Sequence, residues 1–190
     1  MNDQTYWNNF YNNTITKNIN CSDFCFFVMK FFENNREISY VLDCGCGNGR
    51  DSYSLVDKYK VDGIDNSGFI PENKENLKFM CDNFIKYDKS KYDLIYSRFT
   101  LHSITNEQHQ EFLRTINVNT YLAIEVRSIK GIDDDVYYGK THYRNYIDIK
   151  YLENILLKNN FEILFIKEDI DMAKYKTENP ICIRVICKKL

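Results

Sequence analysis

The sequence predicts an α/β protein with a doubly wound, Rossmann-like sheet of seven strands that ends in an antiparallel hairpin. Three observations lead to this fold class. Short apolar runs alternate with helical patterns along most of the chain, which is typical of a parallel sheet with helical crossovers. The first of these runs leads into a glycine-rich turn. The last two runs, 161–167 and 181–188, have no helical pattern between them, so we expect them to pair antiparallel.

The individual elements follow from local patterns. A Ser-Asp start and an aromatic-rich face predict an N-terminal helix at about 22–33. Apolar runs predict five strands before the hairpin, at 38–44, 61–65, 77–81, 92–99 and 121–126. Apolar residues at helical spacing predict helices at 50–59, 106–116 and 147–159. The links 66–76 and 82–91 are short for a parallel crossover, so their helices are expected to be stunted.

Length and composition narrow the range of functions. The 190 residues are expected to form a single domain, 1–190. A net charge of −2 gives no indication of the positive surface that binds nucleic acid. The three His are scattered and the Cys lack the C-x-x-C spacing of a zinc site, so no metal site is predicted. The chain shows no signal-peptide pattern and no apolar run of membrane-spanning length, so we expect a cytoplasmic protein without membrane contact. Nothing in the sequence indicates an oligomeric state.

The turn DCGCGNGR at 43–50 is the main functional signal. It lies between a predicted strand and a predicted helix, where glycines let a backbone approach a ligand closely. A dinucleotide fingerprint starting at Gly45 would place its third glycine at position 50, where this chain has Arg50. The third glycine is Gly49 instead. A nicotinamide-dependent oxidoreductase therefore remains as the weaker alternative.

Carboxylates follow the next two strands at corresponding positions. Asp65 lies twenty residues beyond Gly45, where a carboxylate can accept hydrogen bonds from both ribose hydroxyls of a nucleoside. Asp82, followed by Asn83, ends the third strand in the same way and can meet the amine of an adenine. The pattern indicates an adenosine-containing ligand at the carboxyl edge of the sheet.

The runs VLDCGCGNGRDS, VDGIDNS and YDLIYSRFTLHSI, with a third strand ending in Cys81-Asp82, resemble the class I S-adenosylmethionine-dependent methyltransferase family over nearly the whole chain. The resemblance implies the fold of that family and S-adenosylmethionine as cofactor. In the family, the first acid and the glycines line the methionine part, the second acid holds the ribose and the third meets the adenine. The implied cofactor-binding residues are Asp43, Gly45, Cys46, Gly47, Asp65, Asn66, Asp82, Asn83 and Ser97.

The acceptor is predicted to be a small polar molecule. Family members that methylate amide or nucleobase nitrogens commonly carry an Asn/Asp-Pro-Pro-aromatic run after the fourth strand, where this chain has Ser97-Arg98-Phe99-Thr100. The combination of E-x-R-S at 125–128, H-Y-R at 142–144 and Glu178-Asn179-Pro180 resembles a bacterial subgroup linked to capsular polysaccharide synthesis, including methylation of phosphoramidate groups. Members of that subgroup often have a second Arg where this chain has Asn145.

Two acceptor chemistries stay open. A phosphate or phosphoramidate oxygen is already anionic, and Arg127, Arg144 and His142 would orient it as a clamp. A sugar hydroxyl needs a general base, for which His102 or His142 suits neutral pH. Glu125 completes the set of mixed charges expected at this edge. The acceptor is expected to be phosphorylated or nucleotide-linked.

Another alternative is a non-catalytic partner or sensor domain that binds S-adenosylmethionine or S-adenosylhomocysteine.

Overall fold

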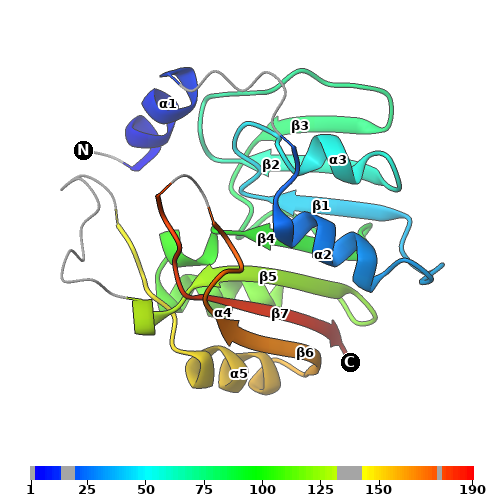
Figure 1. The fold of residues 1–190 in the computed structure, drawn as a ribbon. Coiled ribbons are helices and arrows are strands. Elements are labelled where there is room, and N and C mark those ends of the chain that lie inside the picture. Colours follow the sequence, from blue (N-terminus) through cyan, green and yellow to red (C-terminus); the bar gives the residue numbers. More distant parts are fainter. Residues whose placement is uncertain (1–2, 14–19, 132–142, 175–176) are drawn as a thin grey trace.

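A computed structural model describes residues 3–13, 20–131, 143–174 and 177–190 (Figure 1). Its strands form one seven-stranded sheet of order β3-β2-β1-β4-β5-β7-β6. The strands are β1 (Tyr40–Cys44), β2 (Lys60–Asp65), β3 (Leu77–Cys81), β4 (Leu94–Arg98), β5 (Tyr121–Arg127), β6 (Phe161–Asp169) and β7 (Cys182–Lys189). Strands β1 to β5 are parallel, and β7 pairs antiparallel with both β5 and β6. The predicted doubly wound sheet with a terminal hairpin is confirmed.

Helices cover both faces of the sheet (Figure 1). They are α1 (Asp3–Asn13), α2 (Asp23–Phe31), α3 (Ser52–Leu55), α4 (Asn106–Arg114) and α5 (Ile149–Lys158), with short 3-10 turns η1 (Leu101–Ser103) and η2 (Ile129–Gly131). One buried cluster joins Phe24 of α2 and Leu55 of α3 to the sheet, and a second joins Phe112 of α4 and Leu156 of α5 to its other face. Burial of these apolar side chains on both faces is the main stabilising term.

The crossovers after β2 and β3 are short, as predicted. No helix forms in the described links 66–76 and 82–93, and the helix expected at 50–59 shrinks to α3. The helix expected at about 22–33 is α2. Helix α1 was not predicted, because its sequence DQTYWNNFYNN has no aliphatic stripe.

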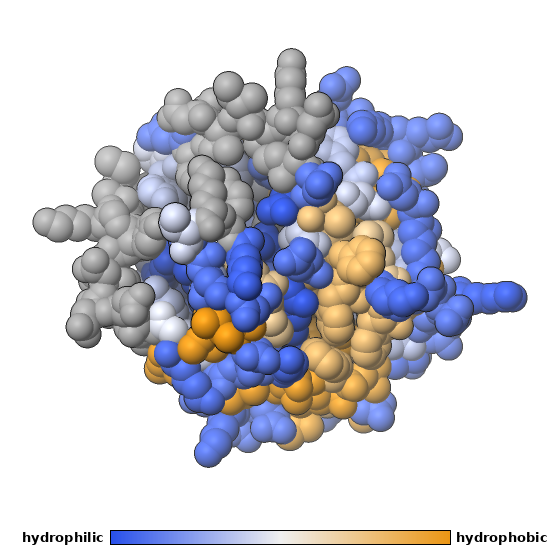
Figure 2. Space-filling view, viewed as in Figure 1, coloured by the Kyte–Doolittle hydropathy of each residue, from blue (hydrophilic) through white to orange (hydrophobic). Residues whose placement is uncertain are grey.

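The face that carries α2 leaves the hairpin partly uncovered. Figure 2 shows apolar side chains gathered over this part of the face. Phe26 and Phe31 of α2 and Leu164 of β6 are exposed there, and the ring of Phe165 lies 5.0 Å from that of Phe27. Helix α2 therefore contacts the hairpin through aromatic side chains.

A buried carboxylate fixes α2 to the start of α3 and to the sheet. Asp51 accepts hydrogen bonds from the amide and the hydroxyl of Ser22, each at 2.7 Å, and from the hydroxyl of Tyr96 in β4 at 2.7 Å. Ser22 is also the N-cap of α2, because its hydroxyl accepts a hydrogen bond from the amide of Cys25. One carboxylate thus sets how the helix, the loop and β4 meet.

Replacing Tyr96 with Phe is expected to lower the free energy of unfolding by about 1–3 kcal/mol, because Asp51 keeps its burial and loses one donor. Tyr59→Phe is the matched control, since the buried Tyr59 hydroxyl has no hydrogen-bond partner among the described residues. That variant should be as stable as the wild type or more so. Urea denaturation measures both, and equal stabilities for the two variants would contradict the role given to Asp51.

Candidate functional site

The glycine loop follows β1 at the edge where the parallel strands end. Gly45 and Gly47 have φ angles of 72° and 53°, in the left-handed region that favours glycine. A Cβ at Gly45 would lie 2.3 Å from the Thr100 hydroxyl, which itself donates to the carbonyl of Cys44 at 2.9 Å. The loop therefore needs glycine where it passes the segment that follows β4.

Asp65 holds this loop against the end of β2. One of its carboxylate oxygens accepts from the Gly47 amide at 2.9 Å and the other accepts from the Ser67 amide at 2.8 Å. The amides of Gly45 and Cys46 both donate to the carbonyl of Ile64. Asp65, the residue predicted to bind a ribose, is therefore held in place beside the loop, where it is half-buried.

Asp43 lies beneath the loop and is 3% exposed. It accepts a hydrogen bond from the Ser52 hydroxyl at 2.5 Å. Burial raises the pKa of the Asp43 carboxyl to about 7, and only Ser52 and the more distant Arg98 act against this effect, while Asp51 and Asp65 add to it. A bound cation would relieve the cost of ionising this carboxyl, so the site favours a positively charged ligand group.

The other predicted cofactor residues come from neighbouring strand ends. Asp82 and Asn83 are exposed after β3, and the Asp82 amide donates to the Asp65 carbonyl at 3.1 Å. Asn66 is exposed after β2, and Cys46 is half-buried in the loop. Ser97 pairs with Cys44 across β4 and β1 and is fully buried. The structure thus brings the ends of β1 to β4 together at one edge.

Arg50 has a structural place. Its Nε donates to the carbonyl of Asn20 at 2.7 Å and its Nη2 to that of Cys21 at 3.3 Å. These bonds tie the end of the glycine loop to the segment before α2. A guanidinium thus stands where a dinucleotide fingerprint would have its third glycine.

Glu125 does not lie at the open edge of the sheet, where the sequence analysis expects it. It is fully buried in β5, where one carboxylate oxygen accepts from Arg98 Nε at 2.9 Å and the other from Arg184 Nε at 2.7 Å. Because Glu125 faces inward between β4 and β7, it cannot touch an acceptor at the edge. It holds Arg98, a side chain the sequence did not single out, through an ion pair.

The ring of Phe99 lies among basic side chains just after β4. The guanidinium carbon of Arg98 is 4.4 Å from its centroid and that of Arg127 is 5.6 Å away. The ring of His102 lies 5.4 Å from it. Phe99 has a φ of 56°, which is strained for a bulky residue, and its amide donates to the carbonyl of Glu125. Arg127 also pairs with Glu178 at 2.6 Å.

Two residues hold the turn that carries His102. Asn145 donates from its amide to the His102 carbonyl at 2.6 Å, and from its side chain to the Ile104 carbonyl at 3.1 Å. His109 of α4 lies 2.7 Å through Nε2 from the Leu101 carbonyl, which can only accept. Burial lowers the pKa of His109, so its neutral form with a proton on Nε2 fits this contact.

These contacts give roles to two residues that the sequence analysis did not assign. Asn145, which stands where the resembling subgroup often has a second Arg, binds the backbone of the His102 turn. It also brings the neighbouring Arg144 to the same edge as His102. His109 was overlooked; its signal was its place on the buried side of α4 with Phe112 and Leu113. His142 lies outside the described residues.

No group of three or more His, Cys, Asp or Glu side chains among the described residues is arranged to hold a metal ion. Likewise, no helix in the part of the chain that the structure describes is long and apolar enough to cross a membrane.

Comparison with known proteins connects this arrangement to one family. Residues 20–165 match the family model described as a methyltransferase domain. A curated relative, malonyl-[acyl-carrier protein] O-methyltransferase 2 of Ilyobacter polytropus, is 29% identical over 163 residues, which is 73% of this chain. The chain spans 61% of the length of that relative.

Solved structures share the fold. Magnesium protoporphyrin IX methyltransferase from Synechocystis PCC 6803, with bound S-adenosylhomocysteine, superposes with a TM-score of 0.72 at 15% identity and covers 100% of both chains. The 1,6-didemethyltoxoflavin-N1-methyltransferase of Burkholderia thailandensis gives a TM-score of 0.68 at 15% identity, covering 87% of this chain and 76% of that chain. At these identities the likeness establishes the fold.

Replacing Asp43 with Asn is expected to remove a pH dependence of stability. The folded-state pKa of about 7 exceeds that of a free aspartate, about 3.9. The native protein therefore holds the extra proton, and the free energy of unfolding should fall as pH rises from about 4 to about 7 and then level off. Urea denaturation across this range should show that fall in the wild type and in the exposed control Asp57→Asn, but not in Asp43→Asn. Parallel curves for all three proteins would contradict the assignment.

Proposed function

Because the chain belongs to the methyltransferase-domain family, we propose that it transfers the methyl group of S-adenosylmethionine to a small polar acceptor. The main observation in support is that the glycine loop, Asp43 and Asp65 lie together at one edge of the sheet. S-adenosylmethionine is the cofactor, and it supplies a methyl group on a positively charged sulfur. The domain is proposed to occupy residues 1–190.

The residues at the edge fit such a cofactor. Asp43 is a buried carboxyl whose ionised form has no cationic partner at hydrogen-bonding distance among the described residues, and the ammonium of a methionine part would provide one. Asp65 stands beside the loop with acceptor oxygens for ribose hydroxyls, and Asp82 and Asn83 are exposed at the next strand end for an adenine. Cys46 and Asn66 lie at the same edge, whereas Ser97 is buried near the end of β4.

The acceptor that we propose is an oxygen of a phosphate, phosphoramidate or sugar group used in surface polysaccharide synthesis. Guanidinium groups support an anionic acceptor, because Arg98 and Arg127 flank Phe99 and Arg144 adjoins the His102 turn. The curated relative is named as an O-methyltransferase, which also favours an oxygen acceptor.

Catalysis would then rest mainly on positioning. Holding the acceptor oxygen in line with the methyl group removes much of the entropic barrier to a displacement reaction. For an anionic oxygen, Arg127 and Arg144 orient the acceptor through charge-assisted hydrogen bonds, with His142 as a further predicted donor. For a sugar hydroxyl, His102 is the described residue at this edge that can accept the proton.

Asp65→Ala is expected to weaken binding of S-adenosylmethionine and S-adenosylhomocysteine by about 10- to 100-fold, because hydrogen bonds to a carboxylate are lost. Calorimetric titration measures this, with NADH as the control ligand and the exposed Asp57→Ala as the control variant. A folded wild-type protein that binds NADH and neither adenosyl compound would overturn the proposed cofactor.

Arg144→Ala is expected to lower kcat/KM for the acceptor at least about tenfold while the affinity for S-adenosylmethionine stays unchanged, since the guanidinium is proposed to bind the acceptor and not the cofactor. Release of S-adenosylhomocysteine measures turnover with a panel of phosphate, phosphoramidate, carboxylate and sugar acceptors. Arg114→Ala, at an exposed position of α4, is the matched control. Unchanged acceptor kinetics in Arg144→Ala would contradict the proposed role of Arg144 in binding the acceptor. A wild-type protein that turns over none of these acceptors would favour the alternative of a non-catalytic sensor domain.

A further inference from the structure

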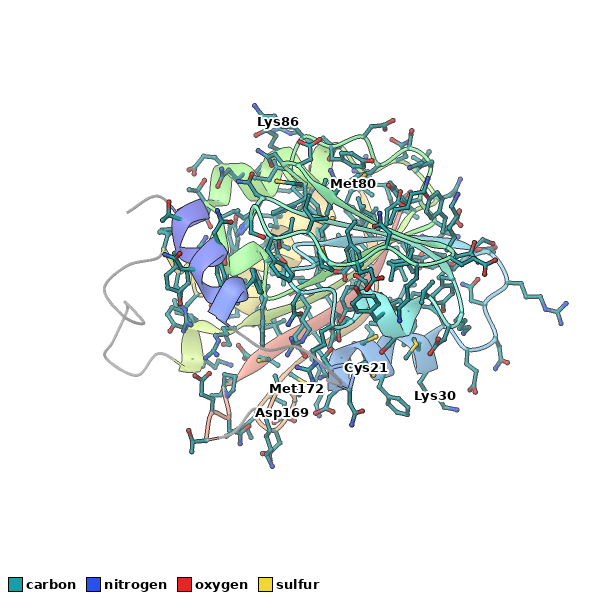
Figure 3. All side chains as sticks on the ribbon, turned by 90° about the horizontal axis from the view of Figure 1, so that it is seen from above. Cys21, Lys30, Met80, Lys86, Asp169 and Met172 are labelled. Carbon is teal, nitrogen blue, oxygen red and sulfur yellow. The ribbon has the colours of Figure 1, made fainter. Side chains whose placement is uncertain are left out.

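Helix α1 lies at the end of the sheet where the parallel strands finish. The view along the sheet face and the view from above agree on this placement (Figures 1 and 3). The glycine loop and Asp65 occupy the same edge. A helix that the sequence did not predict thus stands next to the proposed cofactor site.

Tyr11 of α1 touches the glycine loop itself. A Cβ added to Gly47 would lie 2.3 Å from the Tyr11 hydroxyl oxygen and 2.5 Å from the ring carbon that bears it. Gly47 leaves the room that this side chain fills. Burial raises the pKa of the Tyr11 hydroxyl, and the nearby carboxyl groups of Asp65 and Asp43 add to the effect, so the hydroxyl remains protonated and able to donate.

Contacts with the segment after β2 hold α1 in this place. The Gly68 amide donates to the side-chain oxygen of Asn8. The ring of Tyr11 lies 6.0 Å from that of Phe69 and 5.9 Å from that of Trp7, which is stacked on it. Because Gly68 and Phe69 closely follow Asp65, α1 is fixed to the same turn as the proposed ribose ligand.

The described side chains that we assign to the cofactor leave one part of it unmatched. The methionine part carries an ammonium and a carboxylate. Asp43 and Asp65 suit the ammonium and the ribose hydroxyls, but as carboxylates they repel another carboxylate and cannot donate to it when ionised. A hydrogen-bond donor beside the glycine loop would match this carboxylate. The Tyr11 hydroxyl is a donor and it contacts that side.

We propose, on the basis of the proposed function, that Tyr11 is a cofactor-binding residue supplied by α1. Its hydroxyl donates a hydrogen bond to the carboxylate of the methionine part of bound S-adenosylmethionine. Helix α1 thereby forms one wall of the cofactor site. Because Trp7 is stacked on Tyr11, its fluorescence should depend on whether the cofactor is bound.

Tyr11→Phe tests the hydrogen bond. Calorimetry should show about tenfold or greater loss of affinity for S-adenosylmethionine, because a bond to a charged group is removed. Affinity for methylthioadenosine, which lacks the amino-acid part, should not change. Tyr59→Phe, which removes a buried hydroxyl from the core, is the control and should bind both compounds as the wild type does.

Trp7 provides an independent signal, because it is the one Trp in the sequence. Its emission should change on addition of S-adenosylmethionine and saturate over the concentrations at which calorimetry reports binding. Emission that stays constant while calorimetry shows binding would overturn the placement of α1 against the cofactor.

The affinities of Tyr11→Phe distinguish the remaining outcomes. Wild-type or tighter binding of S-adenosylmethionine would overturn the proposal, and tighter binding would mean that Tyr11 obstructs the site. Equal loss for both compounds would overturn the assignment to the carboxylate. A wild-type protein that binds neither compound would contradict the proposed function itself, which separates that failure from a failure of the role of Tyr11.

Discussion

The hydrogen bond from the Gly47 amide to the Asp65 carboxylate is the constraint on which the proposed site depends. It fixes a loop of left-handed glycines to the end of the neighbouring strand, so that β1 and β2 present their polar groups at one edge. Gly45 adds to this by leaving room for Thr100, which couples the loop to the end of β4. The loop is therefore held from both sides before any ligand binds, which lowers the entropic cost of binding.

Three of the four buried carboxylates among the described residues, Asp43, Asp51 and Glu125, are balanced in different ways. Asp51 receives three hydrogen bonds and sets the position of α2, while Glu125 lies between two arginines and sets that of Arg98. Asp43 accepts one short hydrogen bond, from Ser52, and no cationic side chain among the described residues lies at that distance. A buried carboxylate is costly when neither a cation nor several hydrogen bonds balance it. The first two carboxylates are balanced within the fold, whereas Asp43 is poised for a positively charged ligand group.

The acceptor side is assembled from segments that are distant in the chain. Phe99 follows β4, Arg127 ends β5, and Asn145 reaches the His102 turn from the segment before α5. These pieces meet because strands β4 and β5 are neighbours in the sheet. The same adjacency places the strained Phe99 backbone next to the carbonyl of Glu125.

The sequence by itself determined the sheet, its hairpin and the carboxylates at strand ends, because apolar periodicity and glycine spacing are local and act over a few residues. Asp65 could be placed from its distance to Gly45 alone. Only the tertiary structure decided that Glu125 faces inward between two arginines, that His109 and Asn145 hold the His102 turn, and that Tyr11 lies on Gly47. Those contacts join residues from separate elements, and no local pattern encodes which side chains meet when helices and strands pack.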